Sequence, residues 1–356
     1  MRRKLFIWFL LFWCAVSCVP EDIPRSNLRI VFETGALQTK ADEPDSVVED
    51  GGGIYISENV PDLVILIANN SGDIVATYPN SGRGGIQTGT VEGTPAATRM
   101  SVSFTGLVGD ATYSVYAFAN TQGLWTMKYG GETVSSLTGL TSVTQVEGLQ
   151  FEPIAEDLDA DSCPKVKNSR LPLSAKGTVT LHSSGNGEIS LAMLRCVAKV
   201  TTVFENQYGS ALTLYDFNHT IYHLRPEIGY VVPHETDFPV SWAAAESLHS
   251  EVSTLSLPVD DPDTDSIRED MVTKSWYVFP SIGAYTCDIS FYLDSERTDY
   301  HSYSDLPVHD DHARNIPELA RNQHLTITTR ISKGKSVSFN FEVADWGTKT
   351  ETVTFN

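Results

Sequence analysis

Short runs that alternate apolar and polar residues, separated by turn signals, recur along almost the whole chain of 356 residues. Alternation with a period of two predicts half-buried β-strands, whereas apolar residues spaced by three and four predict helices. Helical periodicity is weak and is limited to two short stretches, residues 135–146 and 243–249. We therefore expect an all-β fold in which antiparallel sheets pack face to face as two β-sandwich domains in tandem.

The clearest β-hairpin signal lies at residues 62–78. The runs DLVILIA and DIVATY flank Asn69-Asn70-Ser71-Gly72, a sequence that favours a tight turn. Further strands are expected at residues 28–33, 100–104, 113–119, 178–181, 188–194, 197–204, 276–279, 287–293, 324–331, 336–343 and 350–355.

The first expected strand places Leu28, Ile30 and Phe32 on one face. The stretch that follows, residues 34–53, is polar and rich in glycine and contains nothing that can build a core. We expect it to be an exposed loop that proteases can reach.

The chain is long enough for two domains of ordinary size. We expect an N-terminal β-sandwich domain over residues 28–187 and a C-terminal one over residues 188–356. The boundary is expected in the turn Ser183–Gly187, which separates two strand-like runs.

The N-terminus has the features of an export signal. Three basic residues follow Met1, and the apolar run 5–13 is shorter than the roughly 20 residues needed to cross a bilayer. The sequence Ala15-Val16-Ser17-Cys18 resembles the lipobox of bacterial lipoproteins, which are cut just before the cysteine that carries the lipid. We expect residues 1–17 to be a removed signal peptide, Cys18 to be lipidated and residues 18–27 to form a polar tether. The alternative is an ordinary signal peptide that is cut elsewhere.

The chain is strongly acidic, with a formal net charge of −20. Nucleic acid and anionic lipid surfaces both require a basic surface, so neither is expected as a partner. An acidic surface keeps an exported protein soluble.

Three cysteines lie beyond Cys18, namely Cys163, Cys196 and Cys287. An odd number without a C-x-x-C motif predicts neither a disulfide framework nor a zinc site. Cys196 and Cys287 lie in apolar runs and are expected to pack as small hydrophobic residues. A single disulfide that uses Cys163 stays open.

Several segments, in order along the chain, resemble the fimbrillins, the type V pilin family of lipoprotein-derived fimbrial subunits. The matching segments are LRIVFETG (28–35), DLVILIANNSGDIV (62–75), YSVYAFAN (113–120), LPLS (171–174), RCVAKV (195–200), RNQHL (321–325) and VADW (343–346). Two positions depart from the family pattern: Lys40 stands where an arginine is usual, and Leu325 stands in place of a tyrosine.

The resemblance implies transthyretin-like sandwich domains and an assembly mechanism. In the family a protease cuts after the basic residue of the first loop, here Lys40, so that the mature chain would begin at Ala41. Loss of the first strand would remove Leu28, Ile30 and Phe32 and expose unpaired backbone groups, which a strand from a neighbouring subunit can replace. The donor would be the C-terminal segment 347–356, in which Val353 and Phe355 share a face.

The implied function is that of a structural subunit of cell-surface fimbriae. It would be anchored by lipid in the outer membrane before maturation, would have other fimbrial subunits as partners and would support adhesion to a host or bacterial surface. Shaft, anchor and tip roles stay open. The alternative is an outer-membrane lipoprotein that binds glycan without polymerising, with Trp125 and Trp242 as surface residues for sugar stacking. Trp276 and Trp346 lie in strand patterns and are expected in the core.

No motif for catalysis occurs: the chain lacks G-x-S-x-G, a P-loop, H-E-x-x-H and a G-x-G-x-x-G that opens a helix. The acidic runs 157–161 and 261–265 begin like calcium loops but lack the later glycine and glutamate. The cluster of histidines and aspartates in residues 301–312 is expected to be a solvated loop. We therefore expect no enzyme activity, no cofactor and no metal.

Overall fold

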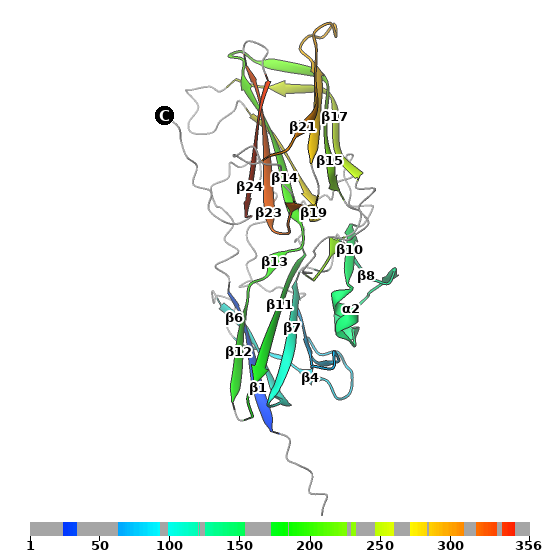
Figure 1. The fold of residues 1–356 in the computed structure, drawn as a ribbon, viewed down its shortest axis with the longest axis vertical. Helices are drawn as coiled ribbons and strands as arrows, with labels where there is room; N and C mark the ends of the chain where they lie inside the picture. The colour runs from blue at the N-terminus through cyan, green and yellow to red at the C-terminus, as the bar shows by residue number, and fades with distance from the viewer. Residues whose placement is uncertain are drawn as a thin grey trace, which may run out of the picture.

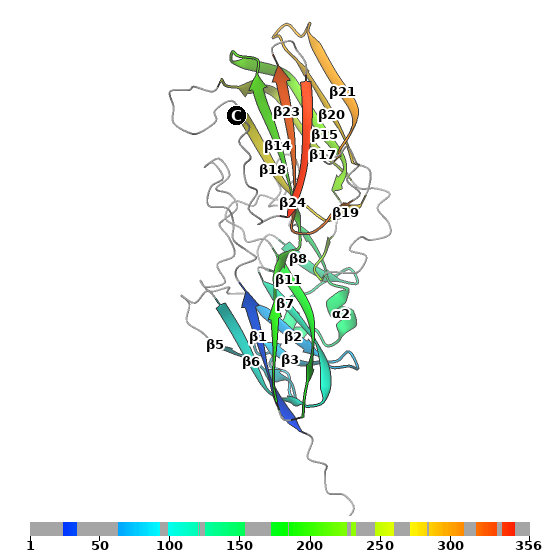
Figure 2. The same ribbon diagram turned by 60° about the vertical axis from the view of Figure 1, so that its left-hand side comes forward.

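The computed structural model describes residues 24–33, 63–92, 99–119, 121, 125–153, 172–183, 185–225, 229–232, 246–259, 271–282, 285–309, 318–332 and 337–345. Its elements are almost entirely β-strands, so the expected all-β fold is confirmed. The strands form two lobes that follow one another along the long axis of the molecule (Figure 1 and Figure 2).

The first lobe contains two packed sheets. The β1 sheet has the order β12–β1–β6–β5, and the β7 sheet has the order β13–β11–β7–β2–β3–β4. The strands of the β1 sheet are β1 (Arg25–Glu33), β5 (Thr90–Glu92), β6 (Arg99–Val108) and β12 (Asn186–Leu191). Those of the β7 sheet are β2 (Val64–Ala68), β3 (Ile74–Tyr78), β4 (Gln87–Thr88), β7 (Ala111–Ala119), β11 (Leu173–Leu181) and β13 (Leu194–Arg195).

A third layer covers the face of the β7 sheet that points away from the β1 sheet. It consists of β8 (Trp125–Tyr129), β9 (Glu132–Thr133), the 3₁₀ turn η3 (Leu137–Gly139), α2 (Val143–Glu147), β10 (Gln150–Pro153) and β16 (Gly229–Tyr230). Helical structure therefore occurs within residues 135–147, near the first of the two expected stretches. The side chain of Ser142 caps α2 by accepting a hydrogen bond from the backbone N–H of Gln145.

The second lobe also contains two packed sheets and a short additional ladder. The β14 sheet has the order β18–β14–β23–β24, with β14 (Ala198–Gln207), β18 (Met271–Val278), β23 (Gln323–Ser332) and β24 (Val337–Asp345). The β15 sheet has the order β17–β15–β20–β21, with β15 (Leu212–Arg225), β17 (Glu246–Leu257), β20 (Thr286–Tyr292) and β21 (Tyr300–Pro307). The ladder pairs β19 (Ser281–Ile282) with β22 (Glu318–Leu319). The cores between the sheets include Trp276, which is buried as expected.

Two local expectations differ from the structure. The expected domain boundary after Gly187 falls inside β12, which pairs with β1 and so lies in the first lobe. The turn before β12 leads from the β7 sheet to the β1 sheet, and the transition between lobes comes later, between β13 and β14. The helix expected over residues 243–249 is wrong where it is described, because residues 246–249 belong to β17, which pairs with β15 along its length.

Candidate functional site at the first strand

The first strand is an interior strand of its sheet. β1 pairs in parallel with β12 on one side and antiparallel with β6 on the other. Figure 2 shows β1 beside β6, and β1 begins at the end of the molecule opposite the second lobe. Removal of β1 would therefore separate β12 from β6 and leave an open groove with unpaired backbone groups on both walls.

The inward face of β1 is completely buried. Leu28, Ile30 and Phe32 are at most 1% exposed and belong to the core between the β1 and β7 sheets. The alternation read from the sequence is thus confirmed for these three positions. The floor beneath them is apolar and comes from the facing sheet, including Ile65, Ile67, Val115, Ala117, Leu173 and Leu181.

At Asn27 and Arg29 the outward face of β1 is polar and contacts both neighbouring strands, whereas Val31, farther along the same face, is buried. The guanidinium of Arg29 donates to the hydroxyl of Ser101 on β6 at 3.2 Å and to the carboxylate of Glu188 on β12 at 3.3 Å. Asn27 donates through Nδ2 to Oδ1 of Asn186 at 3.2 Å. These contacts fix the register of β1 from the solvent side, while the core fixes it from the other side.

A glycine on β12 permits the close packing beside β1. A Cβ added at Gly187 would lie 2.2 Å from Cδ2 of Leu181 and 3.7 Å from Cδ1 of Leu28. Any side chain at this position would therefore require either the side chain of Leu181 or β12 itself to shift. Gly187 was predicted only as the last residue of a turn, and its packing role was not evident from the sequence.

The other residues predicted for maturation and assembly lie outside the described residues. These are Cys18, Lys40 and Ala41 before the second strand, and Val353 and Phe355 at the C-terminus. Lipidation, cleavage and strand donation at these positions remain predictions.

Three of the motifs that carry the family resemblance meet at the junction between the lobes. Arg195 donates through Nη1 to Oδ1 of Asn322 at 3.0 Å, and the backbone N–H of Asn322 donates to the carbonyl of Val197 at 2.9 Å. These bonds join the RCVAKV and RNQHL segments, which lie more than a hundred residues apart in the sequence.

Arg321 extends the same junction to the third motif. Its Nη1 donates to the hydroxyl of Ser174 at 3.2 Å and to the carbonyl of Val231 at 3.1 Å. The side chain is only 7% exposed. In the sequence these motifs were only signs of resemblance, whereas in the structure their polar side chains join the two lobes.

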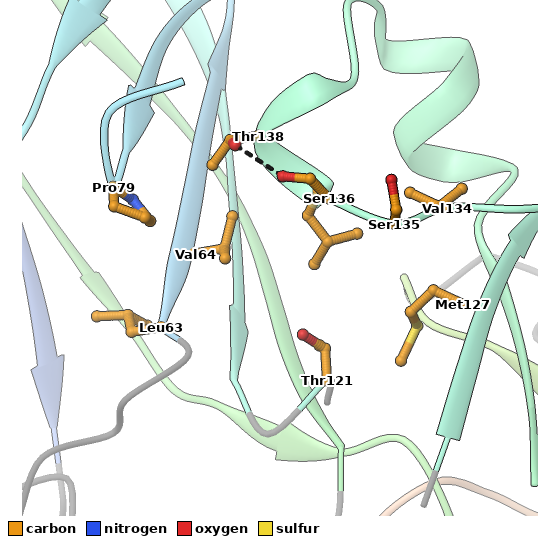
Figure 3. Close-up of a pocket in the computed structure, with 10 residues that line it drawn as sticks. Leu63, Val64, Pro79, Thr121, Met127, Val134, Ser135, Ser136 and Thr138 are labelled. Carbon is orange, nitrogen blue, oxygen red and sulfur yellow. Dashed lines mark hydrogen bonds between the residues drawn. The ribbon is translucent and has the colours of Figure 1, made fainter. Parts of the chain in front are cut away.

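A small depression lies between β2, β8 and the turn η3 (Figure 3). Its volume is about 160 Å³, and its described lining combines apolar side chains such as Val64 and Met127 with the hydroxyls of Thr121, Ser135 and Ser136. The hydroxyls of Ser136 and Thr138 are 3.0 Å apart. None of the ten lining residues is ionisable.

The two described cysteines, Cys196 and Cys287, are buried among apolar side chains, as the sequence predicted. The thiol of Cys196 donates to the carbonyl of Val231 at 3.4 Å, and Cys163 lies outside the described residues. Among the described residues no group of three or more His, Cys, Asp or Glu side chains is placed to hold a metal ion. In the 301–312 cluster, His301 Nε2 is 3.2 Å from Oδ1 of Asp299, and residues 310–312 are not described.

The tryptophans proposed for sugar stacking are not placed by the structure. Trp125 is in β8, but its side chain is not described, and Trp242 and Trp346 lie outside the described residues. No helix in the described part of the chain is both long and apolar enough to span a membrane.

No protein-family model and no curated sequence matches the chain. Several solved structures do. A candidate cell adhesion protein from Bacteroides eggerthii matches with a TM-score of 0.51 at 11% identity over 91% of this chain and 96% of that one. A candidate adhesin from Bacteroides thetaiotaomicron gives 0.45 at 14% identity over 91% and 97%. The fimbrial anchor protein Mfa2 from Porphyromonas gingivalis gives 0.37 at 8% identity over 90% and 98%. The likeness to the first of these shows a shared fold over nearly the whole of both chains.

Proposed function

We propose that this chain is a subunit of cell-surface fimbriae that is exported as a lipoprotein precursor, loses its first strand by proteolysis and assembles by strand exchange. The proposed role is structural and adhesive rather than enzymatic. The observation that carries the proposal is the position of β1, an interior strand at the start of the described chain with three fully buried side chains. The fold shared with a candidate cell adhesion protein is consistent with a surface role.

The energetics favour refilling of the groove. Burial of a large apolar side chain contributes about 1.5–3 kcal/mol, so Leu28, Ile30 and Phe32 together contribute roughly 5–9 kcal/mol, to which the backbone ladder adds. Typical domains are stable by only about 5–15 kcal/mol. A chain that has lost β1 is therefore driven to bind another strand. Since each subunit would donate one strand and accept another, the contact would be head-to-tail and would extend into a filament.

The experiment compares the size of three proteins by size-exclusion chromatography with light scattering: the precursor, a trimmed chain that begins at Ala41, and the trimmed chain without residues 347–356. We expect a monomeric precursor and concentration-dependent oligomers of the trimmed chain. Deletion of the C-terminal segment should abolish these oligomers. As a control, the precursor with Lys40→Ala is exposed to trypsin. Its loop lacks the residue after which cleavage is proposed.

Two outcomes would redirect the proposal. Oligomers that persist after the C-terminal deletion would place the donor elsewhere in the chain. A trimmed chain that stays folded and monomeric would contradict strand exchange and would leave the alternative, a surface lipoprotein that binds glycan without polymerising.

A further inference from the structure

Three tyrosines lie side by side on the outer face of the β15 sheet. Tyr215, Tyr292 and Tyr300 occupy directly opposite positions on the adjacent strands β15, β20 and β21. Their chain neighbours Leu214 and Phe291 are buried in the core, so the alternation of a strand turns the tyrosines toward solvent. We name these three residues the tyrosine row.

The outer part of the row is exposed. Tyr300 is 57% exposed, whereas the other exposed large hydrophobic residues of the described chain, Val108 and Val259, are 39% and 40% exposed. Its ring centroid lies 4.9 Å from that of Tyr292 at an interplanar angle of 45°. Opposite side chains on neighbouring strands are about 5 Å apart, so the row is long enough to contact more than one small ring of a ligand.

A hydrogen-bonded turn and an ion pair position the strands that carry the row. In the hairpin between β20 and β21, the carboxylate of Asp294 accepts hydrogen bonds from the backbone N–H groups of Thr298 at 3.0 Å and Asp299 at 2.6 Å. Arg297, in the same turn, donates through Nη2 to Oδ1 of Asp216 at 3.0 Å. Since Asp216 directly follows Tyr215, this bond ties the turn to the strand that carries the first tyrosine. The site is therefore preorganised.

A row of small polar residues lies next to the tyrosines on the same face. Asn218 pairs with Ser290, and Ser290 pairs with Ser302, on the same three strands. On β17, Thr254 is opposite Tyr215 and Glu251 is opposite Asn218, and both are exposed. Aromatic rings thus lie beside an array of hydrogen-bonding groups.

We infer that the tyrosine row is a binding platform for a neutral glycan. The C–H faces of sugar rings pack on aromatic rings, and sugar hydroxyls hydrogen-bond to amide, hydroxyl and carboxylate groups like those of the neighbouring row. A protein partner would instead require an apolar core of contacts with few charged residues. The exposed Arg297 of the turn is paired with Asp216, so the carboxylates at Glu251 on β17 and Asp299 before Tyr300 set the charge of the surface. Such a surface suits a ligand rich in hydroxyl donors and opposes an acidic one.

The position of the platform suits contact with a glycan outside the subunit. The hairpin between β20 and β21 is at the end of the molecule opposite the one at which β1 begins (Figure 1 and Figure 2). A subunit held through its N-terminal side would therefore present the tyrosine row outward. The inference rests on the surface role of the proposed function, but it does not depend on strand exchange.

Affinity gel electrophoresis of the full-length chain tests the inference. The probes are arabinoxylan, galactomannan, mixed-linkage β-glucan and amylopectin, with polygalacturonate as an acidic probe. We expect at least one neutral polysaccharide to retard the protein. Tyr300→Ala and Tyr292→Ala should each weaken the retardation roughly tenfold, since truncation of a central aromatic contact costs about 1.4 kcal/mol or more. Tyr300→Phe, which keeps the ring, should bind nearly as well as the unaltered chain.

Val108→Ala is the matched control, because Val108 is also exposed, at 39%, but lies in the first lobe. Thermal unfolding of each variant confirms that the binding loss is not a folding loss. The inference is overturned if no neutral polysaccharide retards the protein, if polygalacturonate binds in preference, or if the alanine variants bind unchanged. Oligomer formation by the trimmed chain should be the same with and without Tyr300→Ala, so that failure of the platform and failure of strand exchange are distinguishable.

Discussion

At the scale of single residues, Arg321 is the side chain on which the junction of the lobes most depends. Its guanidinium bonds a side chain and a backbone carbonyl of the surrounding segments while almost fully buried. Arg321→Ala should lower the free energy of unfolding by about 2–4 kcal/mol, because buried acceptors would lose a charged donor. Denaturant unfolding measures the change. Arg297→Ala, which removes an exposed guanidinium, is the control and should change stability little.

Cys287 gives a second prediction at this scale. Burial, with a smaller contribution from Asp288, raises the pKa of its thiol from about 9 to about 12. The folded chain therefore keeps the thiol neutral, and only the thiolate reacts rapidly with alkylating reagents. We expect iodoacetamide to label Cys287 slowly in the folded protein at pH 8–9 and rapidly in denaturant, as measured by mass spectrometry of its peptide. Rapid labelling of the folded chain would contradict the burial.

The same shift has a consequence for stability. In the unfolded chain the thiol ionises from about pH 9, whereas in the folded chain it stays protonated up to about pH 12. Its contribution to stability is therefore complete below pH 9 and is lost as the pH rises from 9 toward 12. Cys287→Ala should reduce the slope of stability against pH in that window.

At the scale of elements, the packing of β12 against β1 depends on the absence of a side chain at Gly187. Gly187→Ala would place a methyl group 2.2 Å from Cδ2 of Leu181, so that side chain or the strand must shift, and stability should fall by roughly 1–3 kcal/mol. Gly185→Ala, two residues earlier, is a matched control because its Cβ would meet nothing within 4 Å. Equal effects in the two variants, measured by thermal unfolding, would contradict the proposed close packing.

The strands were predictable from the sequence where apolar and polar residues alternate in step with buried and exposed positions. The hairpin of β2 and β3 and the inward face of β1 follow from local pattern alone. The boundary after Gly187 was not predictable in this way, because a turn between two sheets of one lobe has the same local chemistry as a linker. The helix expected at 243–249 failed where it is described, since pairing with β15 overrides weak helical periodicity.

The candidate sites were less predictable because they arise from long-range pairing. Tyr215 is far in sequence from Tyr292 and Tyr300, and only the register of three strands brings them into one row. The available signal was local: each tyrosine occupies an outward position of a strand whose inward positions are mostly apolar. Trp125 and Trp242 were the predicted stacking residues instead, because both lie beside expected loops.

At the scale of the whole molecule, the two lobes share part of one core. Val231, Val232 and Phe279 come from the second half of the chain but pack in the cluster on the outer face of the β7 sheet. Phe279 makes an edge-to-face contact with Phe151 of β10, with ring centroids 4.9 Å apart. Together with the hydrogen bonds of Arg195 and Arg321, this cluster couples the lobes by both apolar and polar contacts.

Because of this coupling we expect the described lobes to unfold in one cooperative transition. Calorimetry of the full chain should give equal calorimetric and van't Hoff enthalpies. Phe279→Ala should cost about 3–5 kcal/mol and split the transition, because the ring is the largest of the apolar side chains that link the second half of the chain to this cluster. Tyr300→Ala, an exposed position at the far end of the second lobe, should leave a single transition. If the unaltered chain already shows two transitions, the lobes unfold independently and the junction does not stiffen the subunit. A single transition that Phe279→Ala divides into two would show that the junction contacts couple the lobes and can transmit a force from one lobe to the other.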